Sequence, residues 1–148
     1  FEPQASMRSY ILELDRPTEE LETYIRTIFD SLQIPYQDFD TSFEDTHLHT
    51  GLSLHTHLIP ASFQVLMWVP ETSDYQGRGF IYGSKEKTAT FYPQFGDLCL
   101  MKTNDLNFFH GVEPLKSNIK FRTIIISVDN HGKLGQQLTV TKSSLDPI

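Results

Sequence analysis

Histidine is the residue whose type and spacing in this sequence could most readily support chemistry. The chain has six histidines, and four of them, His47, His49, His55 and His57, lie close together. Residues i and i+2 of a β-strand point to the same face, so each His-x-His pair could bind one ion from a single strand. Neutral imidazole suits iron, zinc, copper or nickel better than magnesium or calcium. The alternative is a set of polar histidines on a half-exposed strand.

Three motifs downstream of the histidines extend this pattern. They are residues 91–98 (FYPQFGDL), 109–114 (FHGVEP) and 121–124 (FRTI). The spacing is 53 positions from His57 to His110 and 12 positions from His110 to Arg122. In order and spacing, the set resembles the iron(II)- and 2-oxoglutarate-dependent oxygenases. The resemblance covers residues 47–128.

The resemblance implies a site and a co-substrate. His55, His57 and His110 would bind Fe(II), and Arg122 would hold the distal carboxylate of 2-oxoglutarate by the bidentate contact that Arg permits. Tyr82 could donate its hydroxyl to the same ligand, or pack in the core. For Arg122 the alternatives are an exposed side chain or a protein acid as its partner.

His57 is where the sequence departs from the family. The usual metal site has two histidines and one carboxylate, and His57 stands at the carboxylate position. Iron bound by three histidines, a nearby acid that substitutes, or a site that has lost its metal all remain open. The interpretation that we favour is a 2-oxoglutarate-dependent iron oxygenase that hydroxylates or desaturates a small organic substrate. The alternatives are a cupin-type dioxygenase with three histidines and no 2-oxoglutarate, and a non-catalytic jelly-roll binding module derived from an oxygenase.

The elements that must position these residues are mostly strands. One helix is expected at about residues 17–33, because apolar residues from Leu21 to Leu32 recur on one helical face and Asp15 or Thr18 can cap its start. Residues 9–14 (SYILEL) alternate as a strand does. Short strands separated by turn-formers fill residues 47–142. The pattern predicts a mainly β fold, a double-stranded β-helix of the jelly-roll or cupin type, with the amphipathic helix packed outside.

Composition limits the remaining possibilities. The 148 residues predict one domain, residues 1–148, and a net charge of −7 without a basic cluster disfavours nucleic acid as a partner. No apolar run is long enough to span a membrane. The single Cys99 and the lack of a signal pattern in residues 1–9 favour a reducing, cytoplasmic location. Because the sequence does not begin with Met, we also expect a trimmed or partial chain.

Overall fold

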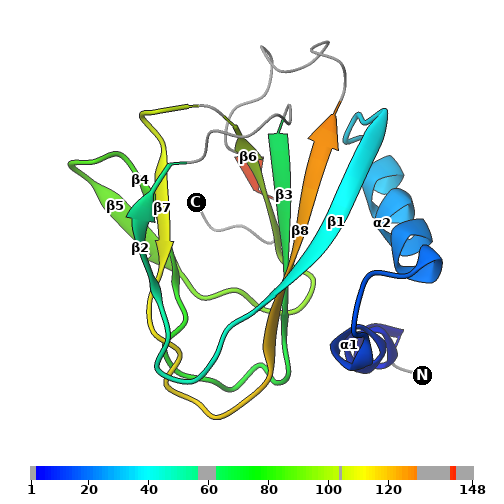
Figure 1. Cartoon of the computed structure of the whole chain (residues 1–148), viewed down its shortest axis with the longest axis horizontal. Helices are drawn as coiled ribbons and strands as arrows, with labels where there is room; N and C mark the ends of the chain where they lie inside the picture. Colours follow the sequence, from blue (N-terminus) through cyan, green and yellow to red (C-terminus); the bar gives the residue numbers. More distant parts are fainter. Residues whose placement is uncertain (1–2, 57–62, 104, 130–140, 143–148) are drawn as a thin grey trace.

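The fold consists of two antiparallel β-sheets that face each other, with two helices on the outer side of one sheet (Figure 1). The computed structural model describes residues 3–56, 63–103, 105–129 and 141–142. The first sheet, sheet A, has the order β1 (Asp38–Asp45), β8 (Phe121–Asp129), β3 (Phe63–Pro70), β6 (Leu98–Lys102) and β9 (Thr141–Lys142). The second, sheet B, has the order β2 (Leu52–His55), β7 (Phe109–Val112), β4 (Phe80–Gly83) and β5 (Thr88–Phe91). The prediction of a mainly β, jelly-roll fold is confirmed.

Alternation along the central strands divides the core into two layers. In β3, Val65 and Met67 belong to the cluster that packs against the helices, whereas Leu66 and Trp68 belong to the cluster between the two sheets. This strand is buried along its whole length because both of its faces are covered. Each residue of sheet A therefore faces either the helices or the interior of the jelly roll, and its position parity decides which.

The helix predicted at residues 17–33 is α2, Glu19–Ser31. Thr18 is its N-cap, and the Thr18 side chain accepts a hydrogen bond of 3.1 Å from the backbone N–H of Leu21. Three glutamates in the first turn complement the positive end of the helix. Its apolar face buries Leu21, Ile25 and Phe29 against sheet A. The predicted helix and its position outside the sheets are thus confirmed.

Two predictions of local structure are wrong. Residues 9–14 were expected to form a strand, but α1 is a helix that spans Pro3–Glu13. The alternation of SYILEL places Ile11 in the buried core, and a helix buries it equally well against sheet A. The strands also begin earlier than residue 47, because β1 occupies residues 38–45. Its acids hid the signal, although Phe39 and Phe43 alternate with them and pack towards the helices.

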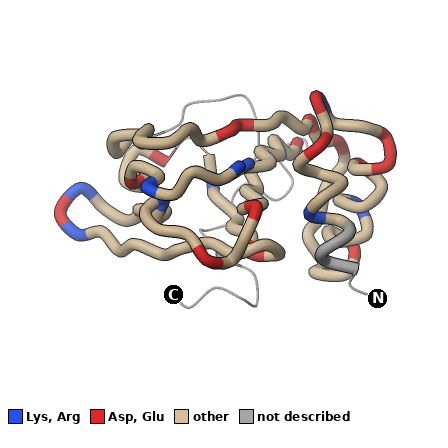
Figure 2. The backbone as a smooth tube through the Cα atoms, turned by 90° about the horizontal axis from the view of Figure 1, so that it is seen from below, with Lys and Arg blue, Asp and Glu red and all other residues tan. Residues whose placement is uncertain are grey.

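Charged residues are distributed over the molecule without a basic face. Figure 2 shows acidic positions at the helical end and along the sheets, while the β4–β5 turn carries Lys85, Glu86 and Lys87. Neither described helix is long and apolar enough to cross a membrane.

Candidate metal centre

His55 and His110 meet inside the jelly roll. They are register partners on the neighbouring antiparallel strands β2 and β7. Their ring centroids are 4.3 Å apart, with the ring planes inclined by 58°. His110 is 6% exposed, and His55 is half-buried at the end of its strand. The expectation that these two imidazoles converge from adjacent strands is confirmed.

A backbone contact orients the His55 ring. Its Nδ1 lies 2.8 Å from the carbonyl oxygen of Ser53, so a proton on Nδ1 can be donated to that oxygen. The Nε2 atom is then the nitrogen that carries a lone pair. Histidines that bind metals commonly hold their ring in this way, with the second nitrogen bonded to a carbonyl or carboxylate. This arrangement fits a metal ligand, although a buried structural histidine can share it.

Tyr82 completes the row of side chains across sheet B. It is the register partner of His110 on β4, so both side chains point into the jelly roll. Burial raises the pKa of the Tyr82 hydroxyl, which therefore stays protonated at neutral pH and can donate a hydrogen bond. The structure thus brings together three of the predicted site residues: His55, His110 and Tyr82.

Sheet A supplies the wall opposite His110. Gln64 on β3 is buried and faces the interior, where its Nε2 donates a 3.1 Å hydrogen bond to the hydroxyl of Ser127 on β8. A cavity of about 10 Å³ lies between Gln64, Met101, Phe108 and His110. That volume is comparable to a single water molecule. The space beside His110 is therefore small and partly polar.

The remaining histidines of the segment do not all reach this place. His57 was expected to be the third ligand, but it lies outside the described residues. His47 and His49 lie in the connection between β1 and β2, where His49 has a φ of 67°, so they do not form a strand pair. Within the described part of the chain, no group of three or more His, Cys, Asp or Glu side chains is arranged to hold a metal.

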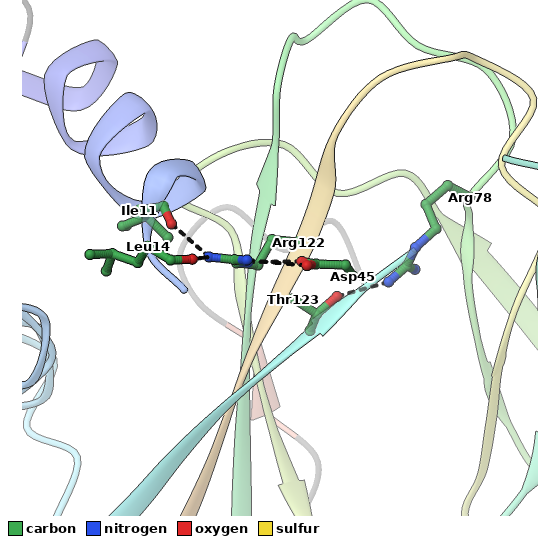
Figure 3. A network of polar contacts seen from close by, with 6 residues as sticks. All are labelled: Ile11, Leu14, Asp45, Arg78, Arg122 and Thr123. Carbon is green, nitrogen blue, oxygen red and sulfur yellow. Dashed lines mark hydrogen bonds and ion pairs between the residues drawn. The ribbon is translucent and has the colours of Figure 1, made fainter. Parts of the chain in front are cut away.

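Arg122 lies on the other side of sheet A, which corrects its predicted role (Figure 3). Its Nε and Nη2 atoms donate hydrogen bonds of 2.8 and 3.1 Å to the two carboxylate oxygens of Asp45. Its Nη1 donates to the carbonyl oxygens of Ile11 and Leu14, at the C-terminal end of α1. Arg122 is an even-numbered residue of β8, like Ile124, so it faces the helices and not the interior. It pairs with a protein acid and is turned away from the histidine pair.

The contacts of Arg122 have a structural purpose. The last carbonyl groups of a helix lack partners within the helix, and a cation that binds them stabilises its negative end. Arg122 also holds the pKa of the Asp45 carboxyl below its usual range, chiefly through their hydrogen bonds. A cavity of about 490 Å³ borders Arg122 on this side, together with Lys120 and His47. Sheet A separates that cavity from His110.

Arg78 is a buried cation that the sequence analysis did not single out. It is 2% exposed and reaches between the sheets, where its Nε donates to the Thr46 hydroxyl at 2.7 Å and its Nη2 to the Thr123 hydroxyl at 2.8 Å (Figure 3). Its Nη1 is buried without a hydrogen-bond partner. Burial lowers the pKa of Arg78 to about 10, so the side chain is still charged at neutral pH. Only its position between two glycines, Gly77 and Gly79, was visible in the sequence, and that does not indicate burial.

The two predicted cofactors fit the described residues unequally. Iron suits the pair of imidazoles, because they converge and the His55 ring is oriented by a backbone oxygen. 2-Oxoglutarate does not fit as predicted, because Arg122 is bonded to Asp45 on the far side of sheet A. The described residues around His110 offer a cavity of about 10 Å³, which is too small for a five-carbon dicarboxylate.

Comparisons with known proteins establish the fold alone. No protein family model matches the chain, and no curated protein matches its sequence. Among solved structures, it is similar to a prolyl-4-hydroxylase from Pseudomonas putida, with 12% identity and a TM-score of 0.62, over 88% of this chain and 82% of that chain. ToxT from Vibrio cholerae O395, bound to a methylnaphthalenyl butenoic acid, has 10% identity over 74% of this chain and 43% of that chain. Its TM-score of 0.48 is too low to support an argument. The chain therefore has the jelly-roll fold of a prolyl-4-hydroxylase.

Proposed function

We propose that this protein is a non-haem iron oxygenase whose metal is held by His55, His57 and His110. The observation that carries the proposal is the convergence of His55 and His110 on paired strands, with ring centroids 4.3 Å apart. His57 is proposed as the third ligand from its spacing alone, since residues i and i+2 of a strand share a face. The fold, shared with a prolyl-4-hydroxylase, supports this proposal.

The residues of the chain would divide the work around the metal. The two imidazoles bind and orient it, and the Ser53 carbonyl fixes the ring of His55. Iron held by such ligands supplies the activation of dioxygen for the oxidation of an organic substrate. Phe80 and Phe108 stack beside His110, with ring centroids 5.9 and 6.0 Å away, and these rings exclude water from its buried side. Substrate would approach from the half-buried His55.

The two candidate reactions differ in their use of 2-oxoglutarate. The displaced Arg122 favours a dioxygenase that acts without this co-substrate, as three-histidine centres of the cupin type do. The order of motifs from His55 to His110 favours the 2-oxoglutarate-dependent reaction, which is the second candidate. The substrate proposed for either is a small organic molecule.

Metal titration tests the site directly. Purified wild-type protein should bind one Fe(II), and His55→Ala and His110→Ala should each bind it about 100-fold more weakly, because each removes a ligand. His49→Ala is the matched control, since it removes an exposed imidazole from the same segment and should leave the affinity unchanged. Equal affinities in all four proteins, measured by calorimetry under anaerobic conditions, would contradict the proposal.

Oxygen consumption then separates the two reactions. Uptake by the Fe(II) protein that needs 2-oxoglutarate, with release of succinate, would identify the 2-oxoglutarate-dependent oxygenase. Uptake with a substrate but without 2-oxoglutarate would identify the other reaction. His57→Ala and His57→Asp extend the test to the third ligand, because an aspartate recreates the usual two-histidine, one-carboxylate site. We expect His57→Ala to lose most of the metal affinity and His57→Asp to recover it.

A further inference from the structure

Three layers of side chains fill the interior of the jelly roll, counted along the inward positions of β4. Tyr82, level with His110, belongs to the first layer. Phe80 forms the second layer, and it is 4% exposed. Arg78 comes two residues before Phe80, with its guanidinium stacked 4.6 Å from the Phe121 ring. The order from the histidines inward is therefore polar, aromatic and charged.

Phe80 occupies the middle of this sequence. Its ring stacks on His110 with centroids 5.9 Å apart, and on its other side it contacts Trp68 at 5.2 Å. Trp68 is in turn the register partner of Thr123, whose hydroxyl accepts a hydrogen bond from Arg78. Aromatic rings thus fill the path from the histidine pair to the guanidinium.

The charge behind these rings is incompletely neutralised. No carboxylate among the described residues lies within ion-pair distance of Arg78, and the Glu44 charge acts on it only from further away. Its hydrogen-bond partners are two neutral hydroxyls, and Nη1 has none. A buried guanidinium with an unused donor has a strong tendency to bind a carboxylate, and Arg is suited to that contact. Phe80 keeps ligands at the histidine pair away from it.

We propose that Phe80 is a specificity-determining residue of the histidine site, which limits its ligands to small anions by separating the His55–His110 pair from Arg78. A single carboxylate the size of acetate could then bind beside His110, whereas a longer dicarboxylate could not extend to the guanidinium. The inference rests on the proposed metal site only for the first of these ligands. The separation of Arg78 from His110 by Phe80 does not depend on a metal.

Ligand binding by Phe80→Ala tests the inference. Calorimetric titrations with acetate and with 2-oxoglutarate would be run on protein loaded with Zn(II), which binds imidazole without redox chemistry, and on protein without metal. We expect wild-type Zn(II) protein to bind acetate but 2-oxoglutarate no more tightly than acetate. Phe80→Ala should bind 2-oxoglutarate at least tenfold more tightly than wild type, and the double variant Phe80→Ala/Arg78→Met should lose that gain.

Phe91→Ala is the matched control. Phe91 is the register partner of Phe80, and it contacts the same Trp68 with centroids 5.3 Å apart. The substitution removes an equal ring from the same cluster, so no gain in 2-oxoglutarate affinity is expected from it. A gain in Phe91→Ala equal to that in Phe80→Ala would show that any loosening of the core admits the ligand, and would overturn the specific role of Phe80.

Other outcomes separate this inference from the proposed function. Failure of wild-type protein to bind Zn(II) or Fe(II) defeats the metal site, while a gain of 2-oxoglutarate binding by metal-free Phe80→Ala would still support the barrier over Arg78. Wild-type protein that binds 2-oxoglutarate as tightly as Phe80→Ala overturns the inference with the metal site intact. Phe80→Leu keeps a large apolar side chain and protects against loss of folding. It should show a smaller gain in the same direction, and no gain in a folded Phe80→Leu and Phe80→Ala also overturns the inference.

Discussion

Arg122 and Arg78 are two buried arginines on opposite faces of sheet A, and their surroundings differ in kind. Arg122 faces the helices and has a bidentate carboxylate partner, Asp45, together with two helix carbonyl groups. Arg78 lies between the sheets and has two hydroxyl partners and one unused Nη1. The protein thus spends one guanidinium on joining a helix to a sheet, while the other remains able to accept an anion.

The electrostatics of the two sites follow from these partners. Burial lowers the pKa of Arg78 to about 10, whereas Arg122 acts on its neighbour by lowering the pKa of Asp45. A buried charge that lacks a counter-ion is costly, and its removal can be neutral or even stabilising. Removal of one partner from a buried ion pair is strongly destabilising. The comparison therefore predicts unequal consequences for the same substitution at the two positions.

The largest expected effect is that of Arg122→Met. It should lower the free energy of unfolding by about 3 kcal/mol, because it leaves Asp45 and the last carbonyls of α1 without their donor. Urea unfolding followed by circular dichroism would measure the change. Lys120→Met is the control: its ion pair with Glu13 is long, at 3.9 Å, and both side chains are exposed, so about 0–0.5 kcal/mol is expected. Equal losses in the two variants would contradict the structural role of Arg122.

Asp45→Asn should have the next largest effect, and the effect should depend on pH. Because the folded-state pKa of Asp45 is lowered, its contribution to stability is complete above its unfolded-state value and is lost as the pH falls through the folded-state value. Wild type should therefore exceed Asp45→Asn in stability at neutral pH. The difference should shrink below about pH 4, the unperturbed value for Asp. A difference that stays constant from pH 7 to pH 2.5 in thermal unfolding would show that the Arg122 contact does not depend on the charge.

Arg78→Met should have the smallest effect, within about 1 kcal/mol of wild type. The substitution removes a costly buried charge, and this gain offsets the loss of hydrogen bonds to Thr46 and Thr123. The same urea titration, run beside Arg122→Met, gives the comparison directly. A loss as large as that of Arg122→Met would place Arg78 among the structural ion pairs, with a counter-ion outside the described residues.

The strands and the histidine pair were predictable because their signals are local. Apolar alternation and turn residues mark β3 to β8, and helical periodicity with Thr18 marks α2. The spacing of His55 and His110 placed them on separate strands, and the pairing of β2 with β7 then joined them. Residues 9–14 failed because six residues of alternation fit a strand and also one face of a helix that packs on a sheet.

The direction of Arg122 could not be predicted, because it depends on which face of β8 points inward. Both faces of this strand are apolar, with Ile124 on the helix side and Ile125 between the sheets. A shift of one position exchanges the faces, and only the pairing with β1 and β3 decides between them. Arg78 is a similar case, since its burial comes from Thr46 and Thr123, which are distant in the sequence.

The contact between Arg122 and the end of α1 also bears on the order of folding. Ile11 and Arg122 are separated by 111 positions, although the carbonyl of one accepts a hydrogen bond from the other. During synthesis α1 is made first, but its last carbonyls must wait for β8, which is made near the end of the described chain. Contacts over such separations close late and slow the folding of a domain. We expect α1 to dock in the final stage of folding, so that its attachment reports that sheet A is complete.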